Sequence, residues 1–128
     1  MQKILIVDDN SDDIEIARVA LAEKGWDLEV EACRQAEKAL EFLRKAEELP
    51  SLLLLDINIP GMGGIACLRE IRADERLRPI PVIMVTASSF EADEKRAYEA
   101  GADFFLFKEF DMDRFGEKLD AALKRLMA

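Results

Sequence analysis

The sequence predicts a doubly wound α/β fold, in which helices cover both faces of a five-stranded parallel sheet. Apolar runs alternate with amphipathic stretches along the whole chain, and the runs are continuous, as in parallel strands buried on both faces. About two dozen residues separate successive runs, which leaves room for a right-handed helical crossover each time. The length of 128 residues suits one domain, and we expect a single domain over residues 1–128 without an output domain.

The first half of the chain is expected to hold three strands and two helices. Capping residues and acids at residues 10–13 predict the start of the first helix, and Gly25 ends it. The second helix cannot continue through Pro50. The run of four leucines at residues 52–55 has no polar side chain, so we place it at the centre of the sheet. The expected strands are 4–7, 28–32 and 52–55, and the inward helix residues are Ile14, Ala17, Leu21, Ala36, Ala39, Leu40 and Leu43.

The second half is expected to hold two strands and three helices. A turn-rich segment at residues 60–64 leads into the third helix. Pro79 and Pro81 flank the start of the fourth strand, and Gly101 ends a fourth helix with a thin apolar face. Asp111 can cap the last helix. The expected strands are 82–85 and 104–107, and the inward residues of the third and last helices are Ile65, Leu68, Ile71, Phe115, Leu119, Ala122 and Leu126.

The residue content excludes several classes of function. With 18 Lys and Arg against 27 Asp and Glu, the net charge of −9 repels nucleic acids and anionic lipids, so we expect neither as a partner. The chain has no histidine and cannot form a Ser-His-Asp triad or a His-ligated zinc site. The N-terminal apolar run is far shorter than a span of ~20 residues, and we expect a cytoplasmic protein. Cys33 and Cys67 are expected to be reduced and packed as small apolar residues.

Polar side chains follow the expected strands where each strand ends. Asp8 and Asp9 follow the first strand, Asp56 follows the third, and Thr86 and Lys108 follow the fourth and fifth. Ligands of open parallel sheets bind beyond the carboxyl ends of the strands, so these side chains predict a site. Three carboxylates would repel one another unless a cation joined them, and an all-oxygen ligand set suits Mg²⁺ better than zinc.

This set of residues predicts phosphoryl transfer to an aspartate. Magnesium takes one or two protein carboxylates, which leaves one carboxylate free to attack a phosphoryl group. The ammonium of Lys108 and the hydroxyl of Thr86 would bind the oxygens of that group. Taken singly, Asp9 and Thr86 could be helix-start residues and Lys108 a surface charge. Asp56 resists such an explanation, because a carboxylate directly after four buried leucines is costly unless the strand has reached a polar edge.

Four motifs spread over the whole chain resemble the receiver domains of two-component response regulators. They are Ile6-Val7-Asp8-Asp9-Asn10, Leu54-Leu55-Asp56-Ile57-Asn58-Ile59-Pro60-Gly61-Met62, Val85-Thr86-Ala87 and Gly101-Ala102-Asp103-Phe104-Phe105-Leu106-Phe107-Lys108. The resemblance implies the flavodoxin-like fold with strand order 2-1-3-4-5 and five helices. It also implies that the phosphoryl donor is a phosphohistidine on a sensor histidine kinase or a histidine phosphotransfer protein.

The resemblance further implies the roles of the residues at the site. Asp56 would be the phosphoacceptor, and Lys108 would contact the phosphoryl oxygens together with the threonine of the third motif. Asp9, Asp56 and the backbone carbonyl of Asn58 would hold Mg²⁺, while Asp8 would act through a water molecule.

A conformational switch is implied as well. Thr86 and Phe105 occupy the switch positions, and Asn58 and Ser88 occupy positions that tune dephosphorylation. Phosphorylation would change the surface of the fourth helix, fifth strand and fifth helix, which would bind a downstream protein or a second copy of the chain. Phe105 and Phe107 lie on one side of an edge strand, where they form either a partner patch or part of the core.

The chain departs from the family pattern at two positions. Glu109 replaces the usual proline that follows the lysine in a cis peptide. Because a cis bond before a non-proline residue costs about 2.5–4 kcal/mol, we expect a trans Lys108–Glu109 bond and a reshaped loop. Gly63 replaces a common aspartate and is expected to loosen the turn without touching the chemistry.

Two other functions stay open at this point. A receiver-like scaffold that is never phosphorylated is conceivable because of Glu109, and it would fail to bind Mg²⁺ or to accept a phosphoryl group. A small aspartate-dependent phosphohydrolase would carry a D-x-D pattern after the first strand, whereas Asp8 and Asp9 are adjacent. The main expectation is a signalling receiver rather than an enzyme, one that catalyses only its own phosphotransfer and dephosphorylation.

Overall fold

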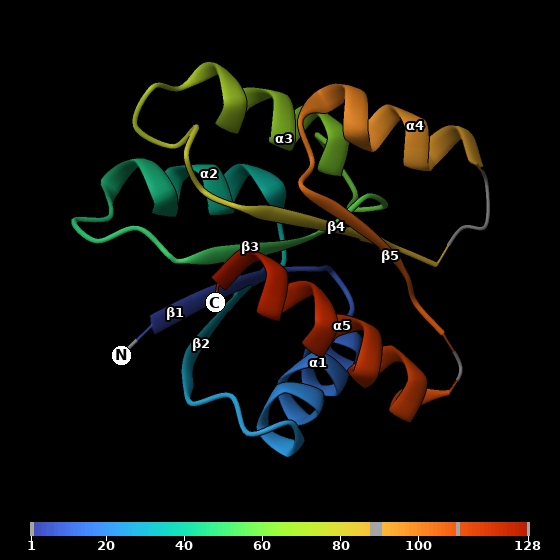
Figure 1. Cartoon of the computed structure of the whole chain (residues 1–128). Helices are drawn as coiled ribbons and strands as arrows, with labels where there is room; N and C mark the ends of the chain where they lie inside the picture. The colour runs from blue at the N-terminus through green and yellow to red at the C-terminus, as the bar shows by residue number, and fades with distance from the viewer. Residues whose placement is uncertain (1, 88–90, 110, 128) are drawn as a thin grey trace.

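The computed structural model describes residues 2–87, 91–109 and 111–127. Within them, five parallel strands form one sheet in the order β2-β1-β3-β4-β5 (Figure 1). This order confirms the predicted doubly wound, flavodoxin-like fold. The strands are β1 (Gln2–Val7), β2 (Leu28–Cys33), β3 (Leu52–Asp56), β4 (Val82–Thr86) and β5 (Phe104–Phe107). The helices are α1 (Ser11–Glu23), α2 (Ala36–Lys45), α3 (Gly64–Ala73), α4 (Glu91–Ala100) and α5 (Met112–Met127).

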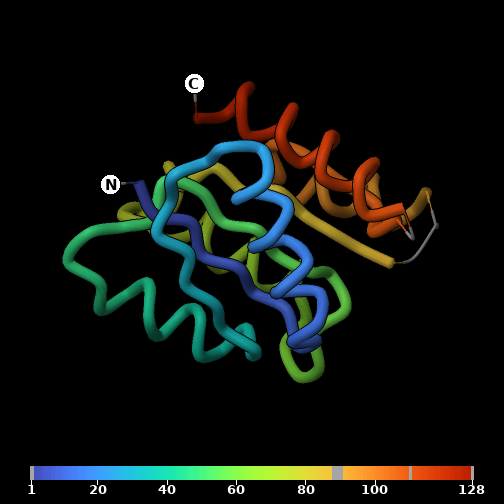
Figure 2. Tube along the Cα trace, turned by 90° about the horizontal axis from the view of Figure 1, so that it is seen from below, coloured from blue at the N-terminus to red at the C-terminus, as the bar shows by residue number. Residues whose placement is uncertain are grey.

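The five helices divide between the two faces of the sheet. Helices α2, α3 and α4 cover one face and α1 and α5 cover the other, where Figure 2 shows them side by side. The two helices meet at Gly116, where a Cβ atom would lie 3.5 Å from the Cβ of Ala20, an ordinary van der Waals contact. Among the helices of the described residues, none is long and apolar enough to cross a membrane.

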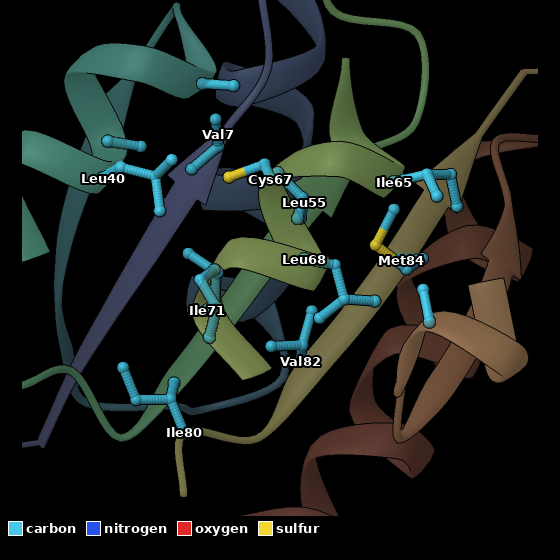
Figure 3. Packing of buried hydrophobic residues seen from close by; sticks show 14 of the residues in the cluster. Val7, Leu40, Leu55, Ile65, Cys67, Leu68, Ile71, Ile80, Val82 and Met84 are labelled. Atoms are coloured by element: carbon cyan, nitrogen blue, oxygen red, sulfur yellow. The ribbon is translucent and has the colours of Figure 1, made fainter. Parts of the chain in front are cut away.

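Side chains along each strand alternate between the two faces, as the pleat of a strand requires. In β3, Leu53 and Leu55 pack toward α2 and α3, while Leu52 and Leu54 pack toward α1 and α5. Figure 3 shows the first group from close by, with Leu55 near residues of α3 such as Leu68. Because of this alternation, the face toward which a residue just after a strand points is set by its position in the sequence.

Two helices, α1 and α5, begin where the sequence provides side-chain caps. The side chain of Asn10 accepts hydrogen bonds from the backbone N–H groups of Asp12 and Asp13, which starts α1. The side chain of Asp111 accepts from the N–H of Arg114 at 3.1 Å, as predicted for the last helix. Leu126 packs against the core and is half-buried, as an inward residue near the end of α5, and Leu123 is a further core residue of this helix.

The ends of the strands differ from prediction by one or two residues. Asp56 and Thr86 are the last residues of β3 and β4, whereas the apolar runs of the sequence predict strands that end one residue earlier. The ladder continues because the N–H of Ile57 donates to the carbonyl of Val85 at 2.9 Å, and that of Lys108 donates to Thr86 at 2.8 Å. Likewise, β1 begins two residues earlier than predicted, at Gln2, and β2 ends one residue later, at Cys33.

The two cysteines are free, as predicted. Cys67 is fully buried in α3, and burial raises the pKa of its thiol to about 12. A thiol with such a pKa is protonated at neutral pH and unreactive. Cys33 is partly buried at the end of β2, so both residues act as packing side chains.

Candidate functional site

Three carboxylates converge at the carboxyl end of the sheet. One oxygen from each of Asp8, Asp9 and Asp56 lies within 4.8 Å of the others. Asp8 and Asp56 are each 5% exposed, and both continue the positions of β1 and β3 that face α1 and α5. The pairing of Val7 with Leu55 in neighbouring strands brings these two ends level. The predicted acidic site is therefore present in the folded chain.

Lys108 places its ammonium among these carboxylates. Its Nζ lies 2.8 Å from Oδ2 of Asp8, 2.8 Å from Oδ2 of Asp13 and 3.1 Å from Oδ2 of Asp56. Lys108 follows Phe104 and Leu106 along the α1 and α5 side of β5, so the alternation of that strand aims it at the carboxylates. A lysine suits this place because its ammonium is a compact charge with three donors.

In both Asp8 and Lys108, burial shifts the pKa in one direction and pairing with an opposite charge shifts it in the other. Burial raises the pKa of Asp8 above its ordinary value, although its hydrogen bond with Lys108 acts against the rise. Burial by itself lowers the pKa of Lys108, but hydrogen bonds with Asp13 and Asp8 outweigh it, and the pKa is raised overall. Lys108 is therefore an ammonium at neutral pH, as a binder of phosphoryl oxygens must be.

Asn58 connects the phosphoacceptor candidate with the switch candidate. Its backbone N–H donates to Oδ1 of Asp56 at 3.2 Å, and its side-chain Nδ2 donates to Oγ1 of Thr86 at 3.1 Å. Thr86 is fully buried and follows Met84 on the side of β4 that faces α3 and α4. Asp56 and Thr86 thus lie on opposite faces of the sheet at its carboxyl end, and Asn58 forms hydrogen bonds with both.

The two phenylalanines of the edge strand belong to the core. Phe105 is buried on the α4 side of β5, and its ring packs edge-to-face against Phe107 with centroids 5.1 Å apart. Of the two interpretations left open by the sequence, core packing is therefore confirmed for Phe105, and Phe107 is half-buried beside it. Ser88, the second residue with a predicted tuning role, lies outside the described residues.

The turn after β3 needs glycine for close packing. The N–H of Gly64 donates to the carbonyl of Ile57 at 2.9 Å, and a Cβ on Gly64 would lie 2.2 Å from the carbonyl oxygen of Asp56. Gly63 has a φ of 82°, a conformation that favours glycine, at the position where the family commonly has aspartate. These residues set the start of α3 directly behind the acidic site.

Sequence reasoning missed two residues that contact the site. Asp13 was interpreted only as an acid at the start of a helix, but it supplies a carboxylate to Lys108. Arg34 donates from Nε and Nη2 to the carbonyl oxygen of Asp9 at 3.2 and 2.9 Å. The signal for Arg34 was its place just after a strand, the same criterion that identified Asp8 and Asp9. The predicted trans bond between Lys108 and Glu109 is confirmed.

The donor set of the site fits a divalent cation. The grouped ligand atoms of Asp8, Asp9 and Asp56 are all carboxylate oxygens, which hard ions such as Mg²⁺ prefer. The three carboxylates that contact Lys108, together with Asp9 in the same cluster, carry more negative charge than one ammonium balances. A bound divalent cation would offset this excess of negative charge.

Comparison with known proteins relates this geometry to a family. Residues 4–120 match the response regulator receiver domain. The chain is 38% identical over 124 residues to chemotaxis protein CheY-3 of Vibrio cholerae, covering 97% of this chain and 93% of that protein. It is 33% identical over 125 residues to response regulator Rre1 of Synechocystis, covering 98% of this chain and 51% of Rre1. The chain thus spans about half the length of this second relative.

A solved structure gives the same relationship. The phosphorylated cyanobacterial phytochrome response regulator RcpA matches with a TM-score of 0.90 at 28% identity, covering 99% of this chain and 94% of that one. The strand order, the acidic cluster and the sequence match over residues 4–120 agree with one another. The chain belongs to the response regulator receiver domain family.

Proposed function

We propose that Asp56 accepts a phosphoryl group in a Mg²⁺-dependent reaction and that phosphorylation switches a surface that binds a protein partner. The observation that carries the proposal is the position of Asp56. Its carboxylate is buried, lies 3.1 Å from the Lys108 ammonium and shares its pocket with Asp8 and Asp9. The family signals rather than acting as a classical enzyme.

The donor in this proposal is a phosphohistidine of a sensor histidine kinase or a histidine phosphotransfer protein. A carboxylate oxygen of Asp56 bonds to phosphorus, the P–N bond breaks, and its electron pair leaves on the imidazole nitrogen. Water later attacks the phosphorus of the aspartyl phosphate, releasing phosphate and restoring the carboxylate. The chain has no histidine, so the imidazole must come from another molecule.

Each site residue has a role in this reaction. The N–H of Asn58 holds Oδ1 of Asp56, while the ammonium of Lys108 moves from carboxylate oxygens to the incoming phosphoryl oxygens. Asp9, Asp56 and the carbonyl of Asn58 would hold Mg²⁺, with Asp8 acting through water. When bound, the ion supplies positive charge to the phosphoryl oxygens.

The switch would begin at Thr86. Its hydroxyl oxygen accepts a hydrogen bond from Asn58, and its O–H would donate to a phosphoryl oxygen, after which Phe105 would change its packing on the same face of the sheet. The affected surface comprises α4, β5 and α5, for a downstream protein or a homodimer. Asn58 and Ser88 would tune dephosphorylation. We further propose that residues 1–128 act as one receiver domain in the cytoplasm, without nucleic-acid or membrane partners.

Intact-protein mass spectrometry after incubation with acetyl phosphate and Mg²⁺ tests the proposal. We expect one phosphoryl adduct that is absent from Asp56→Asn and from protein treated with a chelator. Asp12→Asn is the matched control, because Asp12 is exposed on the first turn of α1 and makes no contact with Lys108 among the described hydrogen bonds. A folded protein that gains no adduct, from acetyl phosphate or from purified phospho-kinases, would favour the scaffold alternative raised by Glu109.

A further inference from the structure

The side chain that follows Lys108 turns back into the molecule instead of pointing into solvent. Glu109 is joined to Lys108 by a trans peptide bond, and its side chain is 21% exposed. Its Oε1 accepts a hydrogen bond from Nζ of Lys118 at 3.0 Å, and its Oε2 lies 3.6 Å from Nε of Arg114. Both cations belong to α5.

The orientation of Glu109 requires a stabilising partner. Its Oε2 is buried and accepts no hydrogen bond from the residues that the structure describes. A carboxylate that loses water in this way is destabilised unless an opposite charge compensates it. A loop residue could reach solvent by rotating its side chain, so the attraction of the two α5 cations is what holds Glu109 inward.

The inward position of Glu109 restrains the backbone of Lys108. On one side, the N–H of Lys108 is fixed by the carbonyl of Thr86 at 2.8 Å. On the other side, Glu109 is tied to α5 by Lys118. Lys108 and Glu109 also line one cavity of about 40 Å³ together with Phe115 of α5, so the ties to Thr86 and Lys118, rather than close packing, restrain the loop at this place.

We propose that the Glu109–Lys118 ion pair positions the Lys108 ammonium for phosphoryl transfer. Glu109 is a positioning residue in this proposal, since it contacts α5 and not the reacting atoms. The ion pair does at this loop what a proline ring does in the family pattern, which is to fix the backbone directly after the lysine. The link to phosphoryl transfer rests on the proposed function of Asp56.

Three variants of α5 test the proposal. Lys118→Met removes the cation, and Lys118→Arg keeps it. Lys124→Met is the matched control, because Lys124 forms another α5 lysine–carboxylate pair of 3.0 Å, with Asp120, and is 69% exposed. The first measurement is the NMR resonance of the Lys108 ε-methylene, which reports the surroundings of the ammonium. The second is the rate of phosphorylation by acetyl phosphate at saturating Mg²⁺.

We expect Lys118→Met to shift the Lys108 resonance and to slow phosphorylation about tenfold, the lower end of the effect of removing a residue that orients a site. Lys118→Arg should retain both wild-type values, and Lys124→Met should change neither. Glu109→Gln, which keeps the shape of the side chain, replaces Lys118→Met if that variant does not fold.

The proposal is overturned if Lys118→Met behaves like Lys124→Met, or if it slows phosphorylation without moving the Lys108 resonance. The resonance also distinguishes a failure of this proposal from a failure of the function proposed for Asp56. If the wild-type chain accepts no phosphoryl group, the function proposed for Asp56 fails, while the resonance still decides whether Lys118 positions the ammonium.

Discussion

Two partly buried cations lie at opposite ends of the sheet and differ in the groups that surround them. Lys108 lies at the carboxyl end, and Arg72 lies at the amino ends of β4 and β5. Their side chains are nearly equally exposed, at 18% and 19%. The partners of Lys108 are three carboxylates, whereas those of Arg72 are the carbonyl oxygens of Gly101, Arg78 and Ile80 and the carboxylate of Asp103.

This contrast separates a structural end of the sheet from the end at which we propose the reaction. The planar guanidinium of Arg72 directs its donors at fixed acceptors, at 2.7 to 3.0 Å, and leaves one carboxylate balanced by one cation. Around Lys108 the negative charge exceeds the positive charge, so the arrangement favours the arrival of another cation. The amino end is stable as it stands, while the carboxyl end is completed by what it binds.

The largest expected effect is on stability at the amino end. Arg72→Met should lower the free energy of unfolding by about 3 kcal/mol, because the partly buried carbonyl groups of Gly101 and Ile80 lose their donor and Asp103 loses its cation. Urea denaturation measures this loss. Arg44→Met is the control, since Arg44 is half exposed and its ion pairs are 3.8 and 3.9 Å long, and it should cost less than about 0.5 kcal/mol. Equal losses in the two variants would contradict the structural role of Arg72.

A smaller and reversible effect is expected at the carboxyl end. Lys108→Met should lower the free energy of unfolding by about 2 kcal/mol in the presence of a chelator, because the carboxylates of Asp8, Asp13 and Asp56 then face one another without a cation. Millimolar Mg²⁺ should restore most of this loss by binding the folded state alone. In Arg72→Met, Mg²⁺ should add no more stability than it adds to the wild-type chain. A loss in Lys108→Met that Mg²⁺ leaves unchanged would contradict the assignment.

The same substitution should act with opposite signs at the two ends. Asp8→Asn should raise the free energy of unfolding of the metal-free chain by about 1 kcal/mol at neutral pH, because it removes a buried charge that its surroundings disfavour. Asp103→Asn should lower it by about 1 kcal/mol, because Arg72 loses its ion pair. Urea denaturation in chelator measures both changes.

The pH dependence of Asp8 follows from the direction of its shift. Because its folded pKa is raised above the ordinary value of 3.8, the folded chain holds this proton more tightly than the unfolded chain does. The contribution of Asp8 to stability therefore falls as the pH rises from 3.8 through the raised pKa, and is regained as the pH falls. Asp8→Asn should remove this component from the stability profile of the metal-free chain. A profile unchanged by the substitution would show that Asp8 is not the group responsible.

The sequence predicts the fold and the main site because both depend on local patterns. Continuous apolar runs locate the strands, and a carboxylate such as Asp56 after four leucines indicates the end of a buried strand. Parallel pairing then brings the strand ends together without further information. These inferences require only the order of elements along the chain.

Other contacts depend on how helices and loops pack, which no local pattern expresses. Asp13 reaches Lys108 across 95 positions of sequence, and its carboxylate resembles any other helix-start acid when it is considered alone. Arg72 is an ordinary polar residue near the end of α3, and its donors meet acceptors from the loops that precede β4 and β5. Glu109 was recognised as a departure from the family, but its ion pair with Lys118 depends on the position of α5.

The smallest effect on stability concerns an arginine that contacts a carbonyl group at the carboxyl end. Arg34 donates two N–H groups to the carbonyl of Asp9, as Arg72 does to carbonyls at the other end, but Arg34 is exposed. Arg34→Met should therefore change the free energy of unfolding by less than about 0.5 kcal/mol, since water replaces the lost donors. Its effect should fall on the metal site, because the backbone of Asp9 becomes free to move the proposed Mg²⁺ ligand. Calorimetric titration should show a few-fold weaker Mg²⁺ binding, and Arg34→Lys should recover part of it. If Arg34→Met binds Mg²⁺ with wild-type affinity, the carbonyl contact of Arg34 has no role in positioning Asp9. The two arginines then differ in function as well as in burial.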